Sequence, residues 1–147
     1  MTTLQQVLLT PENQPHVIDD SLTLIHEEVS GKSGVSGAAV KLAYKTANTF
    51  ASGYIHGMLE VLVPEMVVKL EPFWADFAAS GAGDFGDYLV KHGDEVSEAL
   101  LSVTDAHAEI STRPTILKAY RAVRGGAPKH IIAALPALGA LVQKYAG

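Results

Sequence analysis

Apolar residues recur along this chain every three or four positions, and that spacing places them on one face of an α-helix. The alternating, β-branched runs that are typical of strands are missing from the sequence. We therefore predict an all-α fold, an irregular helical bundle of about seven helices that forms a single domain over residues 1–147.

Glycine and proline mark the expected ends of these helices. Gly31 and Gly125 each follow an apolar run, in the position that glycine commonly takes just past a helix end. Pro72 is expected to break or kink the helix that reaches Leu70. The clearest loop signal runs from Ser80 to Gly86, and this loop is a candidate hinge between two lobes.

The chain carries few charges for its apolar content. Hydrophobic residues make up 48% of it and charged residues 18%, against roughly 25% charged residues in an average soluble protein. Some apolar surface is therefore expected to meet a ligand, a protein partner or a second copy of the chain. The absence of cysteine excludes disulfides, thiolate metal sites and a cysteine nucleophile.

The first residues, Met1 to Gln5, lack the basic and apolar regions of a signal peptide, so we expect a cytoplasmic protein. The longest apolar stretches lie near residues 58–70 and 131–142. Charged residues or proline interrupt both stretches, and both are shorter than the roughly 20 residues that cross a bilayer. We therefore expect no transmembrane segment.

Charge is divided unevenly along the chain. Residues 1–109 contain all 16 acidic residues and five basic ones, whereas residues 110–147 contain six basic residues and no acid. The helix expected over residues 113–124 combines these charges with an apolar arc. We assign Ile116, Ala119, Tyr120 and Val123 to the apolar arc and Arg113, Arg121 and Arg124 to another.

This basic helix has three interpretations. It can pair internally with the acidic helix that carries Asp94, Glu95, Glu98, Asp105 and Glu109, or it can lie on an anionic lipid surface. It can also bind an acidic partner, although a net charge of -5 argues against nucleic acid as that partner. The candidate surface for an anionic partner consists of Arg113, Lys118, Arg121 and Arg124.

Aromatic residues are concentrated around the predicted loop. Helical spacing brings Phe73 and Phe77 together, and the glycine turn can fold the following helix back on them. Such a cluster forms either part of the core or the wall of an apolar pocket. Its members are Phe73, Trp74, Phe77, Phe85 and Tyr88.

No motif for a cofactor or for catalysis withstands inspection. The segment from Gly81 to Gly86 matches G-x-G-x-x-G, but a helix precedes it and Asp84 and Asp87 would repel phosphate. The six histidines are scattered, without the spacing of a metal or haem site. We therefore predict no cofactor, no metal site and no enzymatic activity.

Five segments carry a resemblance to a known family. They are residues 32–41, 70–77, 83–89, 118–120 and 134–136. Over nearly its full length, the chain resembles an uncharacterised family of small actinobacterial proteins of unknown function. The resemblance implies a free-standing cytoplasmic helical protein, and it assigns no role to any residue.

Together these observations favour a non-catalytic helical interaction module that associates with itself as a homo-oligomer or binds another protein. The alternative is a binder of lipids, acyl chains or an anionic membrane surface. That binder would use an apolar pocket between helices together with the basic helix 113–124.

Overall fold

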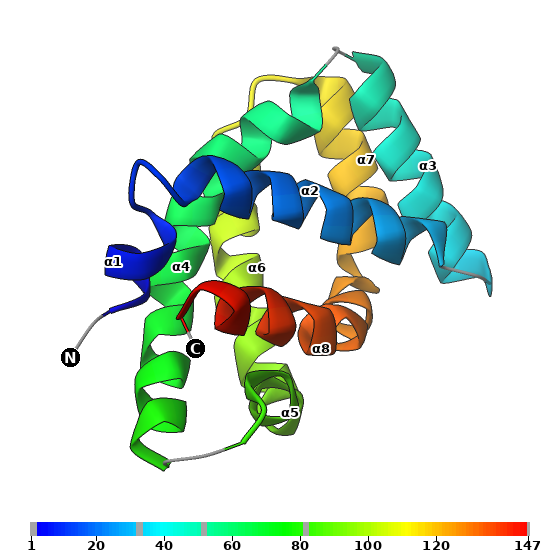
Figure 1. Cartoon of the computed structure of the whole chain (residues 1–147). Coiled ribbons are helices and arrows are strands. Elements are labelled where there is room, and N and C mark those ends of the chain that lie inside the picture. The colour runs from blue at the N-terminus through cyan, green and yellow to red at the C-terminus, as the bar shows by residue number, and fades with distance from the viewer. Residues whose placement is uncertain (1–2, 32–33, 51–52, 81–82, 147) are drawn as a thin grey trace.

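The computed structural model describes residues 3–31, 34–50, 53–80 and 83–146, with the backbone alone described at residues 34–36 and 47–50. Within these residues the chain forms eight helices and no strand (Figure 1). This confirms the prediction of an all-α domain. The helices are α1 (Leu4–Leu8), α2 (Gln14–Ser30), α3 (Gly34–Phe50), α4 (Tyr54–Ser80), α5 (Phe85–Lys91), α6 (Gly93–Glu109), α7 (Pro114–Arg124) and α8 (Ala127–Ala146).

The longest helix, α4, continues through both of its prolines, so of the break or kink predicted at Pro72 the break is wrong. A proline inside a helix removes one backbone hydrogen bond and crowds the preceding turn. The core offsets that cost, because α4 buries apolar side chains on both sides of Pro72, among them Leu70 and Phe77. Tertiary packing thus overrides the local signal, as it commonly does.

Helices α5 and α8 approach each other at two glycines. A Cβ atom added to Gly139 would lie 2.2 Å from the backbone nitrogen of Gly86. The side chain of Gln143 on α8 also accepts a hydrogen bond of 2.9 Å from the backbone N–H of Phe85. Small residues at this crossing therefore allow the two backbones to touch, and α8 caps the first turn of α5.

The core is one contiguous cluster of buried side chains from α1, α2, α4, α5, α6 and α8. It includes Phe77 before the candidate hinge, Phe85 within it and Leu89 after it. The loop from Ser80 to Gly86 therefore connects helices of a shared core, and not two separate lobes. Gly81 and Ala82 of this loop lie outside the described residues.

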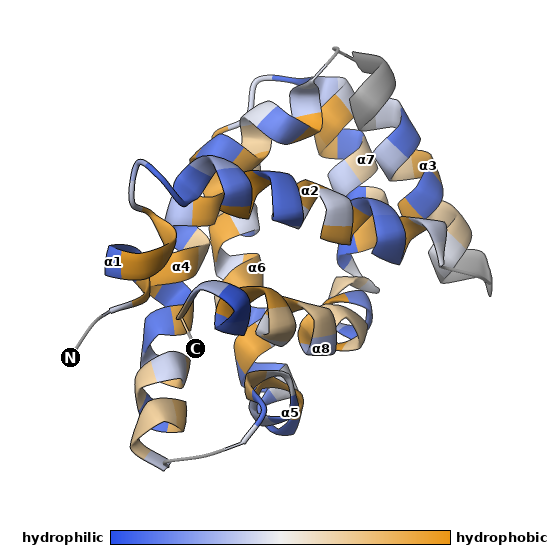
Figure 2. Cartoon of the chain, viewed as in Figure 1, coloured by the Kyte–Doolittle hydropathy of each residue, from blue (hydrophilic) through white to orange (hydrophobic). Residues whose placement is uncertain are grey.

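Helix α7 stands apart from this core. It packs against α3, and the two helices run side by side at one end of the molecule (Figure 1). Although α7 is amphipathic, none of its residues is buried. Figure 2 shows that α7 carries both hydrophilic and hydrophobic residues, whereas most residues of α8 are hydrophobic. Helix α7 thus leaves apolar side chains without full burial.

Among the described helices, no single one is both long enough and apolar enough to cross a membrane. Helices α7 and α8 reach the required length and composition only together, and they are bent at 83° to each other.

Candidate functional site

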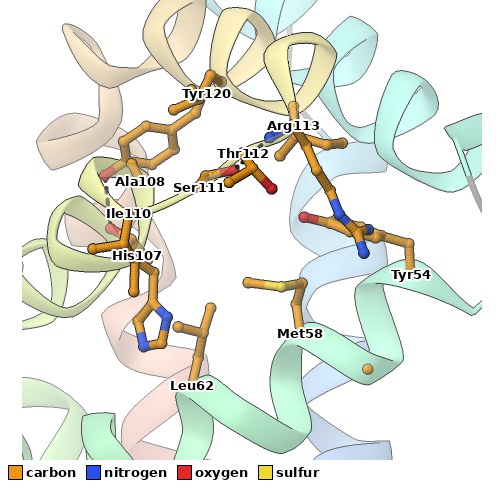
Figure 3. A pocket seen from close by; sticks show the side chains of 14 residues that line it. Tyr54, Met58, Leu62, His107, Ala108, Ile110, Ser111, Thr112, Arg113 and Tyr120 are labelled. Carbon is orange, nitrogen blue, oxygen red and sulfur yellow. Dashed lines mark hydrogen bonds between the residues drawn. The ribbon is translucent and has the colours of Figure 1, made fainter.

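A hollow of about 600 Å³ lies between the first half of α4, the end of α6 and the start of α7 (Figure 3). It opens to solvent and is lined mainly by apolar side chains, among them Met58, Leu62, Ile116 and Leu117. We call it the α4–α6–α7 pocket. Its volume is within the range of roughly 300–1,000 Å³ that is usual for small-molecule sites.

The floor of the pocket is one face of α4. Tyr54, Met58 and Leu62 are four residues apart, and this spacing aligns their side chains along the helix. In Figure 3 all three rise from α4 toward the link between α6 and α7. Gly57 is also on this floor, and apart from its own stretch of helix no atom lies within 4 Å of the place where its Cβ would be. The floor is therefore apolar and has free space above it.

The opposite wall is the end of α6 and the segment that follows it. His107 lines the pocket, and its Nε2 atom hydrogen bonds to the carboxylate of Glu65 on α4. Ile110 also lines the pocket, yet 76% of its surface is exposed to solvent. An apolar ligand that covered this side chain would remove its surface from water, which is favourable.

Helix α7 is joined to α6 by a polar cluster of Thr104, Asp105, Tyr120 and Arg124, here called the Asp105 cluster. The guanidinium of Arg124 donates two hydrogen bonds to Asp105, of 2.8 and 3.0 Å. The hydroxyl of Tyr120 donates a third to the same carboxylate, and it lies 2.8 Å from the hydroxyl of Thr104. Because Thr104 and Tyr120 line the pocket, this cluster sets the distance between two of its walls.

The contacts of the Asp105 cluster change its titration. The hydrogen bonds from Arg124 and then from Tyr120 hold the pKa of Asp105 below its ordinary value. Burial, followed by the hydrogen bond to Asp105, raises the pKa of Tyr120. The carboxylate therefore stays ionised and the phenol stays neutral at neutral pH, which are the states that this hydrogen-bonded geometry requires.

A family of unknown function, DUF6918, matches residues 4–146. The chain belongs to this family. Its membership confirms the resemblance to an uncharacterised family, while the actinobacterial origin stays a prediction. No curated protein and no solved structure matches the chain. The family brings no known activity with it, so the function has to be argued from the site.

The predicted aromatic residues do lie together, but they pack against one another as part of the core and do not form the wall of a pocket. The ring of Phe85 has no exposed surface, and its centre lies 5.0 Å from that of Trp74 and 5.2 Å from that of Phe77. Tyr88 packs on both phenylalanines, and Phe73 is packed against the core. None of the five residues lines the α4–α6–α7 pocket.

Tyr88 has a polar contact at the edge of this cluster. Its hydroxyl donates a hydrogen bond to Asp76, and burial together with this bond raises the pKa of Tyr88 to about 12. Of the two interpretations of the aromatic cluster, the packing favours the core.

The predicted basic surface is divided by the fold. Arg124 is held by Asp105, which is the internal pairing with the acidic helix. Arg124 follows Tyr120 by four residues and lies about 40° from it around the helix, at the edge of the basic arc, so both side chains reach the same carboxylate. Arg113 lies at the rim of the pocket with its guanidinium 5.5 Å from the centre of the Tyr54 ring. Lys118 and Arg121 are both exposed.

Sequence reasoning did not find the α4–α6–α7 pocket, because its wall residues come from three separate helices and the α6–α7 link and form no motif. The one available signal was the apolar arc of residues 113–124, which contributes Ile116 and Tyr120 to the wall. Within the described residues, no three histidine or carboxylate side chains are grouped closely enough to hold a metal ion. The absence of a cofactor and of enzymatic activity stays a prediction.

Proposed function

We propose that this protein binds an apolar small molecule in the α4–α6–α7 pocket. The observation that carries the proposal is an open hollow of about 600 Å³ with a largely apolar wall. Sites for small molecules are typically concave and apolar, with a few polar groups that orient the ligand. Here the hydroxyls of Ser111 and Thr112 supply such groups beside the apolar side chains.

The incomplete burial of α7 supports the same proposal. An amphipathic helix normally hides its apolar face in a core, but α7 has no buried residue. Ile116 and Leu117 are only half-buried, and both line the pocket. A ligand that covers them would gain about 25 cal/mol for each Å² of apolar surface removed from water. An occupant would thus complete the packing between α7 and α4.

The test is a titration of the purified chain with Nile red, a neutral dye whose emission shifts to the blue in an apolar site. We expect saturable binding of one dye per chain. Met58→Trp fills the hollow from its floor and should weaken binding by about tenfold or more, the equivalent of about 1.4 kcal/mol. Binding that is absent, or that Met58→Trp leaves unchanged, would contradict the proposal.

A matched pair of surface variants controls for nonspecific binding of the dye to exposed apolar side chains. Ile110→Ser removes an exposed aliphatic side chain at the pocket, and Leu42→Ser removes one on α3 that is 66% exposed and does not line it. Only the first substitution should weaken binding of the dye. Equal effects would show that the dye reports exposed apolar surface and not the pocket.

Self-association is the second candidate function. Val61 and Val68 on α4 are 51% and 49% exposed, and they are two turns apart on the same side of the helix. A second copy of the chain would cover them. Native mass spectrometry of the chain and of the double variant Val61→Asp/Val68→Asp tests this candidate: a multimer that becomes a monomer supports it, and a monomeric native chain refutes it.

A further inference from the structure

A second hollow, of about 460 Å³, adjoins the α4–α6–α7 pocket. The two share Ser111, Thr112 and Leu117 in their walls. The remaining lining of the second hollow is different in character, because it consists of Pro114, Lys118 and Arg121. An apolar space and a basic space are thus neighbours along the start of α7. We call the second hollow the basic hollow.

The cations of the basic hollow differ from the nearby Arg124. That guanidinium is held in two hydrogen bonds by Asp105. Within the part of the chain that the structure describes, neither Lys118 nor Arg121 makes an ion pair or a side-chain hydrogen bond. No acid occurs after Glu109, at the end of α6. These two cations are therefore available to an anion from outside the chain.

The geometry points to one class of ligand: we infer that the protein binds a free single-chain amphiphile with an anionic head group, a carboxylate or a phosphate. This inference rests on the proposed function, because the aliphatic chain would occupy the α4–α6–α7 pocket. The head group would lie in the basic hollow and accept charge-assisted hydrogen bonds from Lys118 and Arg121. Leu117, shared by both hollows, marks the passage from chain to head group.

The orientation of α7 favours a free amphiphile over the surface of a bilayer. A basic helix that lies on a membrane turns its apolar side toward the lipid. In α7 the apolar residues Ile116, Leu117 and Tyr120 line the pocket, whose other walls belong to α4 and α6. A bilayer could therefore meet Lys118 and Arg121, but not the apolar face of the same helix.

The experiment is displacement of Nile red by amphiphiles that share a dodecyl chain and differ in the head group, each below its micellar concentration or, for the alcohol, its solubility. We expect dodecanoate and dodecyl phosphate to displace the dye with about tenfold higher affinity than dodecanol at low salt. Dodecyltrimethylammonium, with the opposite charge, should be weaker than the alcohol. Added salt should reduce the advantage of the anions, because ions screen exposed charges.

The double variant Lys118→Gln/Arg121→Gln should lose the preference for anions and keep its affinity for Nile red. Its matched control, Lys69→Gln/Lys129→Gln, removes the same charge from exposed positions on α4 and α8 and should keep the preference. A preference that both double variants lose equally is an effect of net charge and overturns the inference.

The remaining outcomes separate this inference from the proposed function. If dodecanol and dodecanoate displace the dye equally well, the inference is wrong and the pocket proposal stands. If the chain does not bind Nile red at all, the pocket proposal itself fails. If it sediments with phosphatidylglycerol vesicles but binds no free anion, the anionic chemistry belongs to a bilayer surface and the free amphiphile is refuted.

Discussion

The contact between α5 and α8 gives the sharpest test of the fold, through the substitution Gly139→Ala. The added Cβ atom would lie 2.2 Å from the nitrogen and 2.3 Å from the Cα atom of Gly86. Ordinary contacts of a Cβ atom begin at about 3.4 Å, and both close atoms belong to the backbone. The substitution therefore forces the two helices apart by about 1 Å, because no side chain can rotate to make room.

The expected loss of stability follows from two opposing effects. Overpacking of a well-packed contact typically costs about 1–3 kcal/mol, and more when the backbone must move. In the opposite direction, alanine in place of glycine within a helix stabilises the folded state by up to about 1 kcal/mol. Because Phe85 and Leu89 have no exposed surface and move with α5, we expect a net loss of about 2 kcal/mol.

Urea unfolding, monitored by circular dichroism, measures this loss. In thermal unfolding the melting temperature should fall by about 4–8 °C. Gly57→Ala is the matched control, since Gly57 also lies inside a helix and, apart from its own stretch of helix, no atom lies within 4 Å of its Cβ position. That substitution should stabilise the chain by about 0.5–1 kcal/mol. If Gly139→Ala is neutral or stabilising, the close approach of α5 and α8 is refuted.

Two further substitutions test the core and the Asp105 cluster. Phe85→Ala should cost about 3–5 kcal/mol in unfolding free energy and change the fluorescence of Trp74, whose ring it contacts; an unchanged spectrum would refute the aromatic packing. Asp105→Asn should destabilise the chain at pH 7. The folded pKa of Asp105 is below the ordinary value of 3.8, so its carboxylate stabilises the fold above that pH and loses the effect as the pH falls through the folded pKa. The difference in urea midpoint between the native chain and Asp105→Asn should therefore shrink toward acid, and a constant difference would exclude the pairing with Arg124.

Local signals predicted the fold class and the helix ends at two glycines. Gly31 caps the end of α2, and Gly125 caps the end of α7. The break at Pro72 was wrong for a reason that no local pattern contains. Whether a proline ends a helix depends on what the flanking turns bury, and here they bury Leu70 and Phe77.

The candidate site was harder to predict than the fold. Residue type made the aromatic cluster a candidate pocket wall, because large rings are typical of ligand pockets as well as cores. The structure fills that cluster with its own rings, whereas the pocket lies among aliphatic positions such as Met58 and Ile116. Cavities arise where packing stays incomplete, and sequence periodicity shows which face turns inward without showing how well that face is filled.

Helix α7 connects the interpretations that the sequence left open. Internal pairing and binding of an external anion exclude each other only if all the basic residues act together. The fold divides the basic residues between the two roles, because Arg124 reaches Asp105 on α6 while Lys118 and Arg121 line the basic hollow. The internal pair holds α7 at the distance from α6 that keeps the pocket open. The same pair therefore prepares the site that Lys118 and Arg121 would serve. Loss of the Arg124 side chain should weaken ligand binding, although Arg124 itself does not line either hollow.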